Sequence, residues 1–204
     1  MRRITLALVA AASAGAARGE PWRASAGEGD RIVVHVLKKG ILSAFAHDHH
    51  FEVTRWRVTA EVSGDAPASV EVVLAADSLR DTQEHLSEAD RRKVDAQAAG
   101  PDTLDARRYP RIEFRSEGFE ADRDSSPEHL AGRLRGTLTL HGRSVPLEVS
   151  VEGRREGDEW SVRGKAHLKQ SEVGIKPFSG FGGTIGVKDE IEVEVALTLR
   201  PGSP

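Results

Sequence analysis

Apolar and polar residues alternate along several stretches of this chain, with a period of two residues. The clearest example covers residues 132–140 and 145–153, where Leu134, Leu138 and Leu140 share one parity and valines continue the pattern in the second run. Such an alternation buries one face of a β-strand and exposes the other. The segment 141–144 separates the two runs and contains the glycine that a tight turn needs. The pattern therefore predicts a β-hairpin.

The same alternation predicts further strands on both sides of this hairpin. They cover residues 30–38, 51–63, 69–76, 160–168 and 189–200, and another strand follows Pro110 with Ile112 and Phe114 on one face. Within 51–63 the apolar positions change parity near Thr54 and Arg55, which indicates a bulge or bend. The sum is about eight antiparallel strands, and each has an apolar face that needs a closed or packed partner.

Two segments depart from the strand pattern. Residues 81–99 predict a helix, because Asp81 and Glu84 resemble a capping box and Gly100-Pro101 is a stop signal. The apolar stripe of this helix is ragged, which places it on the surface over a barrel rim or edge. Residues 169–187 are rich in glycine and predict a flexible loop at the barrel mouth.

The predicted fold class is therefore all-β, an extended eight-stranded antiparallel barrel with one surface helix. The barrel domain covers residues 30–200 and follows a flexible lead-in at 17–29. Residues 1–16 predict a signal peptide, with a basic start at Arg2-Arg3, an apolar stretch at 4–12 and small residues before a cleavage point after Ala16. The apolar stretch is too short for a stable membrane anchor. We therefore expect a periplasmic or secreted protein.

Composition narrows the function classes further. The 204 residues include no cysteine, which excludes disulfides, thiolate chemistry and cysteine-ligated metals. The net charge is −3 with both signs mixed along the chain, and no basic stripe suggests a nucleic-acid partner. The sequence contains no nucleophile elbow, phosphate loop or dinucleotide fingerprint, so we do not expect an enzyme. Nothing in the sequence favours a small hydrolase in particular.

Several short motifs resemble one known family. They are Tyr109-Pro110-x-Ile112-x-Phe114-x-Ser116, Gly136-x-Leu138-Thr139-Leu140-His141-Gly142, Pro146-Leu147, Ser171-Glu172-Val173-Gly174-Ile175 and Asp189-Glu190-Ile191-Glu192-Val193. Together they resemble the YceI-like family, lipocalin-like proteins of the bacterial periplasm that bind polyisoprenoid lipids. The resemblance extends over about residues 30–199 and implies a barrel that encloses a long apolar chain. Residues 78–104 and the histidine run at 47–50 depart from the family's usual pattern.

The resemblance and the strand pattern together suggest which residues form the ligand site. The candidates in the barrel interior and mouth are Phe45, Phe51, Trp56, Val58, Phe114, Leu138, Leu140, Trp160 and Phe178. A barrel of small aliphatic residues with a few aromatics leaves room for one slender ligand, although any single aromatic could simply fill the core. Arg55, Arg57, Arg107 and Arg108 could meet a polar head at the rim. The expected function is a non-catalytic carrier for a polyisoprenoid, an isoprenoid quinone or a similar lipid, and a homodimer remains open.

The run His47-Asp48-His49-His50 carries an alternative function. In an extended strand His47 and His49 share one face and His50 points to the other. With a third ligand such as His35 or His141, these residues could bind Zn²⁺ or Cu²⁺ in a metal-binding or redox-accessory protein. The alternative explanation is that the histidines are solvated, or that one of them holds a barrel end through hydrogen bonds, and paired histidines without a further motif are a weak metal signal.

Overall fold

The computed structural model describes residues 21–27, 29–39, 48–63, 66–180, 182 and 184–202. The signal peptide predicted at 1–16 lies outside these ranges. The elements are β1 (Trp22–Ser25), β2 (Arg31–Lys39), β3 (His49–Val53), β4 (Trp56–Ser63), β5 (Ala66–Ala75), β6 (Leu79–Asp81), α1 (Glu88–Ala98), β7 (Arg111–Ala121), β8 (His129–Leu140), β9 (Arg143–Glu156), β10 (Glu159–Lys169), the 3₁₀ helix η2 (Gln170–Val173), β11 (Ser179–Gly180) and β12 (Ile185–Pro201). No helix in the described part of the chain has the length and apolarity needed to cross a membrane.

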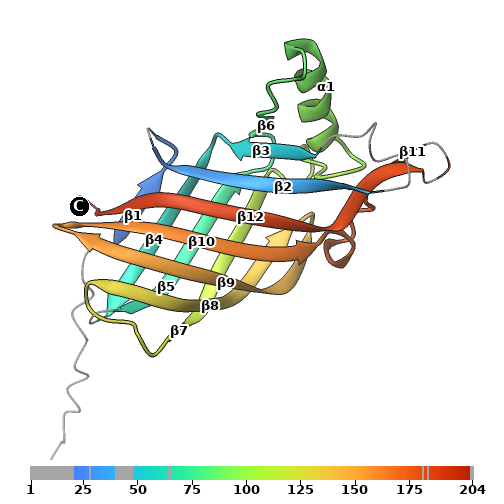
Figure 1. Ribbon diagram of the computed structural model, residues 1–204. Coiled ribbons are helices and arrows are strands. Elements are labelled where there is room, and N and C mark those ends of the chain that lie inside the picture. The colour runs from blue at the N-terminus through green and yellow to red at the C-terminus, as the bar shows by residue number, and fades with distance from the viewer. Residues whose placement is uncertain are drawn as a thin grey trace, which may run out of the picture.

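The strands close into an antiparallel barrel (Figure 1). The hydrogen-bonded order is β1-β4-β5-β7-β8-β9-β10-β12, and β12 pairs back with β1 to complete a ring of eight strands. The predicted eight-stranded antiparallel barrel with one α-helix is therefore confirmed for the described residues. The lead-in predicted at 17–29 is wrong for β1, because Trp22 pairs with Ala60 on one side and Pro201 on the other. This short strand joins the two edges of the sheet.

Two neighbouring segments of the wall, β3–β4 and β5–β6, are each interrupted by a short break, and the two breaks lie side by side. β3 and β4 are separated by Thr54 and Arg55, where the parity change predicts a bend, and β5 and β6 are separated just opposite. The fully buried Ser78 joins the two breaks, because its carbonyl accepts from Thr54 N at 2.9 Å and its Oγ accepts from Arg55 N at 3.3 Å. Beyond the bend, β3 pairs with β2 and β6 and extends the wall past the closed ring.

The predicted central hairpin is present, but its turn is shorter than the predicted segment 141–144 because Arg143 and Ser144 already pair with β8. His141 and Gly142 alone connect β8 and β9 and have φ angles of 52° and 72°. Two successive positive φ values are typical of the type I′ turn, whose twist matches that of the flanking strands. Leu134, Leu138 and Leu140 are buried, as their shared parity predicts.

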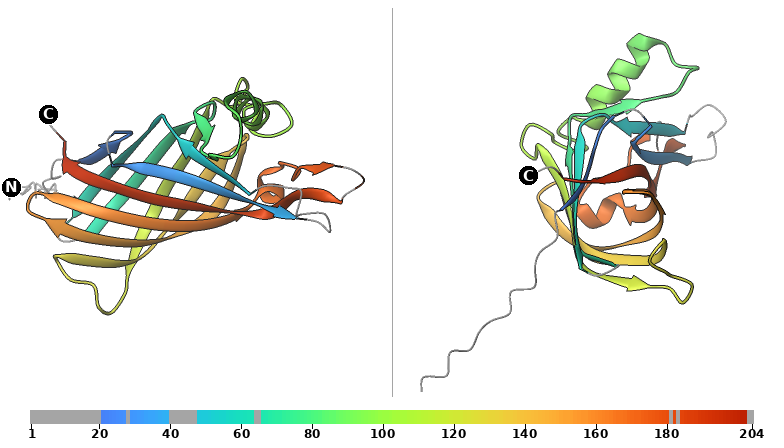
Figure 2. Two further views of the ribbon diagram at one scale, coloured as in Figure 1. Left: turned by 45° about the horizontal axis from the view of Figure 1, so that its top comes forward. Right: turned by 90° about the vertical axis from the view of Figure 1, so that its left-hand side faces the viewer.

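The helix begins later than the sequence suggests. Its N-cap is Ser87, whose Oγ accepts a hydrogen bond from Asp90 N at 3.1 Å, and the predicted start at Asp81 is wrong. Asp81 instead ends β6, where it pairs with Phe51 of β3. The predicted end at residue 99 is nearly correct, because the last helical residue is Ala98. α1 has no buried residue and stands at one end of the barrel, outside the wall (Figure 2).

The segment predicted as a flexible loop at 169–187 contains regular structure. η2 follows β10 directly, and β11 pairs with the start of β12. Val173 is fully buried and Ile175 nearly so, in one cluster with Leu104 and Ala106 from the loop before β7. η2 contacts β9, β10 and β12, and it closes the barrel at this end. Phe181 lies outside the described residues.

The backbones of β7 and β8 lie so close together at Gly136 that there is no room for a side chain. A Cβ at this position would lie 2.2 Å from the Arg115 carbonyl oxygen, next to the register shift between Ser116 and Gly118. We expect Gly136→Ala to lower the free energy of unfolding by about 1–3 kcal/mol, because the backbone must move to accept the methyl group. Urea unfolding measures this as a lower midpoint with an unchanged slope. Gly164→Ala is the control, since its Cβ would have no neighbour closer than 3.5 Å; equal midpoints for the two variants would contradict the prediction.

Candidate functional site

The barrel encloses a cavity of about 790 Å³. Every strand of the closed ring contributes to its wall, which comprises 37 described residues. Arg155 is the only one of them with a charged side chain, and the others are aliphatic, aromatic, proline or glycine residues. The chemistry of this wall favours an apolar occupant.

The cavity exists because the inner faces of three strands carry short side chains. Val149 and Val151 of β9, Gly164 of β10, and Val193 and Val195 of β12 all line it. An eight-stranded barrel has an interior just wide enough for side chains to fill. Valine and glycine are too short to do so from one wall, and these inward-facing residues therefore remain only half-buried.

One end of the cavity reaches solvent. Trp22, Trp160, Arg155 and Pro201 line the cavity there and are partly or largely exposed. Trp160 and Arg155 are direct cross-strand partners. The Arg155 guanidinium donates to the carbonyl of Gly157 at 3.3 Å and forms no ion pair with a described residue. The end with Trp22 is therefore the mouth, and the end with Val173 is closed.

The predicted ligand residues fall into three groups. Val58, Phe114, Leu138, Leu140 and Trp160 line the cavity. Phe51 and Trp56 are buried in the surrounding core but are not part of the cavity wall, and Phe178 is 52% exposed and also not part of it. Phe45 lies outside the described residues. None of the four arginines predicted at the rim lines the cavity, whereas Arg155 does.

The residues that leave the space free were not among the predicted ligand residues. Gly164, Val149, Val193 and Val195 lie on the apolar parity of strands that were predicted correctly. The signal that could have found them was this parity, combined with small side-chain size. Trp22 had no such signal, because only its pairing with β4 and β12 places it at the mouth.

The two described histidines of the run, His49 and His50, have different partners. His49 and His50 point to opposite sides of β3, as the alternation predicts. His49 Nδ1 lies 2.6 Å from the Asp81 carboxylate, whose side chain is fully buried. His50 Nδ1 lies 2.5 Å from His35 Nδ1. His47 lies outside the described residues, and His141 instead contacts the Val173 carbonyl at 3.3 Å.

His35 belongs to a cluster of charged side chains on the outer face of the barrel, together with Glu192, Glu194 and Lys165. His35 Nε2 lies 3.3 Å from Glu194, and Lys165 Nζ lies 3.0 Å from Glu194 and 3.1 Å from Glu192. The hydrogen bond from Lys165 holds the pKa of the Glu194 carboxyl below its ordinary value. In return, Glu194 and Glu192 raise the pKa of the Lys165 ammonium. Glu194 is therefore ionised at neutral pH.

Comparisons with known proteins agree with this architecture. A family model described as the YceI-like domain matches residues 36–199. The crystal structure of Burkholderia cenocepacia BcnA is similar with a TM-score of 0.62 and 16% identity, over 83% of this chain and 95% of that one. A Campylobacter jejuni YCEI protein is similar with a TM-score of 0.52 and 16% identity, over 72% of this chain and 82% of that one. At this identity the two structures show a shared fold. A comparison with curated proteins found no match.

Proposed function

The chain belongs to the YceI-like domain family, and from this premise we propose that it is a non-catalytic carrier of a long-chain apolar ligand. The ligand class is a polyisoprenoid, an isoprenoid quinone or a similar lipid, held in the barrel interior. The observation that carries the proposal is the apolar cavity of about 790 Å³, in which Arg155 is the only charged residue among the described residues of the wall. Its size falls in the usual range of small-molecule sites, about 300–1,000 Å³.

Apolar burial supplies the binding energy in this mechanism. Each methylene group that leaves water contributes about 0.8 kcal/mol. Ten such groups would contribute about 8 kcal/mol, from which the ordering of the ligand and its lost freedom are subtracted. The described cavity wall offers no carboxylate, imidazole, hydroxyl or amine side chain that could act as a nucleophile or a general base, which supports binding without catalysis.

The mouth suggests how the ligand is oriented. Its tail would enter past Trp22 and Trp160 and extend toward Leu140 and Leu168, which line the wall near the closed end. A polar head group would then remain beside Arg155, whose guanidinium can donate to a phosphate or a carbonyl oxygen. The basic start and apolar stretch of residues 1–16 support export of this carrier to the periplasm or the medium.

Native mass spectrometry of the mature protein from its own cells tests the proposal. We expect a mass above that of the polypeptide, and we expect organic extraction to release a long apolar molecule and restore the polypeptide mass. The extracted protein should then take up an added long-chain isoprenoid alcohol. A bare polypeptide that also fails to take up this alcohol would contradict the carrier function.

A further inference from the structure

Four side chains form a row across neighbouring strands on the outside of the barrel. His50 of β3 is the cross-strand partner of His35 on β2, His35 is the partner of Glu192 on β12, and Glu192 is the partner of His167 on β10. Their sequence neighbours Val34, Val193 and Ala166 line the cavity, so the row faces outward. Glu194 is the next outward residue along β12. Strand pairing thus gathers imidazoles and carboxylates from distant parts of the chain.

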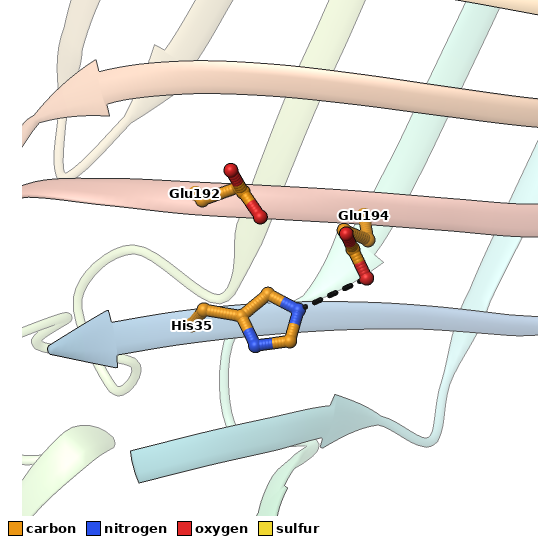
Figure 3. A group of neighbouring side chains, drawn as sticks. All are labelled: His35, Glu192 and Glu194. Carbon is orange, nitrogen blue, oxygen red and sulfur yellow. Dashed lines mark hydrogen bonds and ion pairs between the residues drawn. The ribbon is translucent and has the colours of Figure 1, made fainter. Parts of the chain in front are cut away.

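Two side chains of this row, His35 and Glu192, lie close enough to Glu194 for the three to share one ion. One ligand atom each from His35, Glu192 and Glu194 all lie within 4.8 Å of one another. Figure 3 shows the three side chains on two adjacent strands, with the Glu194 carboxylate directed at the His35 ring. The side chains are 20%, 30% and 48% exposed, so an ion can reach them from solvent. On the far side of Glu192, His167 Nε2 lies 3.4 Å from its carboxylate.

We propose that His35, Glu192 and Glu194 bind a divalent ion of the Zn²⁺ type on the outer wall of the barrel. Imidazole nitrogen and carboxylate oxygen are ligands that Zn²⁺ accepts in proteins, and three protein ligands leave one position for water. The site is separate from the cavity, and its success or failure is independent of the carrier function.

His50 acts as a positioning residue for this site. Its Nδ1 lies 2.5 Å from His35 Nδ1, and one of the two nitrogens must carry a proton between them. When a neutral His35 donates from Nδ1, its lone pair lies on Nε2, the atom that faces Glu194 and would bind the ion. A metal-binding histidine commonly donates its other ring N–H to a neighbour in this way, which fixes the tautomer and the ring orientation.

Lys165 is the natural competitor of the metal ion. Its ammonium contacts both carboxylates, at 3.0 and 3.1 Å, and already provides the positive charge that they attract. The Lys165 side chain is 47% exposed and can move into solvent when an ion enters. Removing its charge while keeping its length should therefore favour the ion.

Competition with a chromophoric zinc chelator measures the affinity of the full mature protein. We expect one Zn²⁺ per chain, a loss of at least about 100-fold in His35→Ala and a loss of about 10–100-fold in His50→Ala. Lys165→Met should bind Zn²⁺ more tightly than the parent protein. Glu192→Gln provides the same test as His35→Ala with less change in volume, in case circular dichroism shows that the alanine variant is unfolded.

His129→Ala is the matched control. His129 Nε2 also lies 3.3 Å from a glutamate, Glu152, on the outer face of the barrel, and this pair lies outside the proposed site. Its removal should leave Zn²⁺ affinity unchanged. The proposal is overturned if the parent protein does not compete with the chelator, if His35→Ala and Glu192→Gln bind as the parent does, or if His129→Ala loses as much affinity as they do.

Discussion

Replacing Gly164 by phenylalanine is expected to abolish the uptake of a long apolar ligand while the barrel stays folded. Gly164 lies on β10 between Val162 and Ala166, and all three line the cavity. A Cβ here would meet Ser150 O and Val149 Cγ1 at 3.5 Å and Val195 Cβ at 3.6 Å, which are ordinary contacts. The backbone therefore accepts a side chain, and the ring must extend into the cavity.

The expected loss of affinity is large. A ring that displaces five methylene groups of the ligand removes about 4 kcal/mol of apolar burial, a factor of about 1,000 in Kd. Native mass spectrometry should show the variant without the adduct that the parent protein carries. Titration with a brominated long-chain alcohol should quench the fluorescence of the parent protein, because Trp22 and Trp160 line the cavity, and should leave that of the variant nearly unchanged.

Arg163→Phe is the control for this variant. Arg163 is the preceding residue of β10 and is exposed, since alternate residues of a strand point to opposite faces. This variant introduces the same ring on the outside and should bind the ligand as the parent does. A Gly164→Phe protein that keeps its adduct would place the ligand somewhere other than the cavity.

The strands of the barrel were predictable because their signals are local. The alternation of Leu134, Leu138 and Leu140 against polar neighbours depends only on which face is buried, and Gly142 provides one of the two positive φ angles of the turn. The bend at Thr54 and Arg55 was visible as a change of parity. These features need no knowledge of distant partners.

The cavity was harder to predict because it forms where inward-facing side chains are small. Of the aromatic residues predicted for the site, Phe114 and Trp160 line the cavity, whereas Phe51, Trp56 and Phe178 do not. The space arises opposite Gly164 and the valines of β9 and β12, and depends on how far the opposite walls are apart. That distance follows from strand number and tilt, which no single segment encodes.

The polar groups were predicted only in part, because strand register decides which of them meet. His35 and His50 were candidate metal ligands, but Glu192, Glu194 and His167 were not. The outer row joins His50, His35, Glu192 and His167, which belong to four strands. Asp81 matched a capping-box pattern, yet its pairing with β3 directs its carboxylate to His49. The long-range contact between Asp81 and His49 therefore decides the role of Asp81, and the local capping pattern does not. This contact makes His49 and Asp81 suitable for a stability test.

Removal of the His49 imidazole is expected to destabilise the barrel by about 2–4 kcal/mol. The Asp81 carboxylate is fully buried and accepts from His49 Nδ1 at 2.6 Å and from the backbone N–H of Gln83 at 2.8 Å. Breaking one side of a buried pair typically costs about 3–5 kcal/mol, and the 23% exposure of His49 reduces this figure through solvent screening. Urea unfolding of His49→Ala, followed by tryptophan fluorescence, measures the free energy of unfolding.

His129→Ala is again the informative comparison, because its pair with Glu152 is solvent-exposed and should contribute less than about 1 kcal/mol. A double-mutant cycle with Asp81→Asn then isolates the interaction between His49 and Asp81. We expect a coupling of about 1–3 kcal/mol, as for residues in direct contact. Additive effects of the two single variants would contradict this coupling. The cost of His49→Ala would then arise from lost packing on Phe51, whose ring centroid lies 5.9 Å from that of His49. The buried carboxylate would in that case depend on the backbone N–H of Gln83.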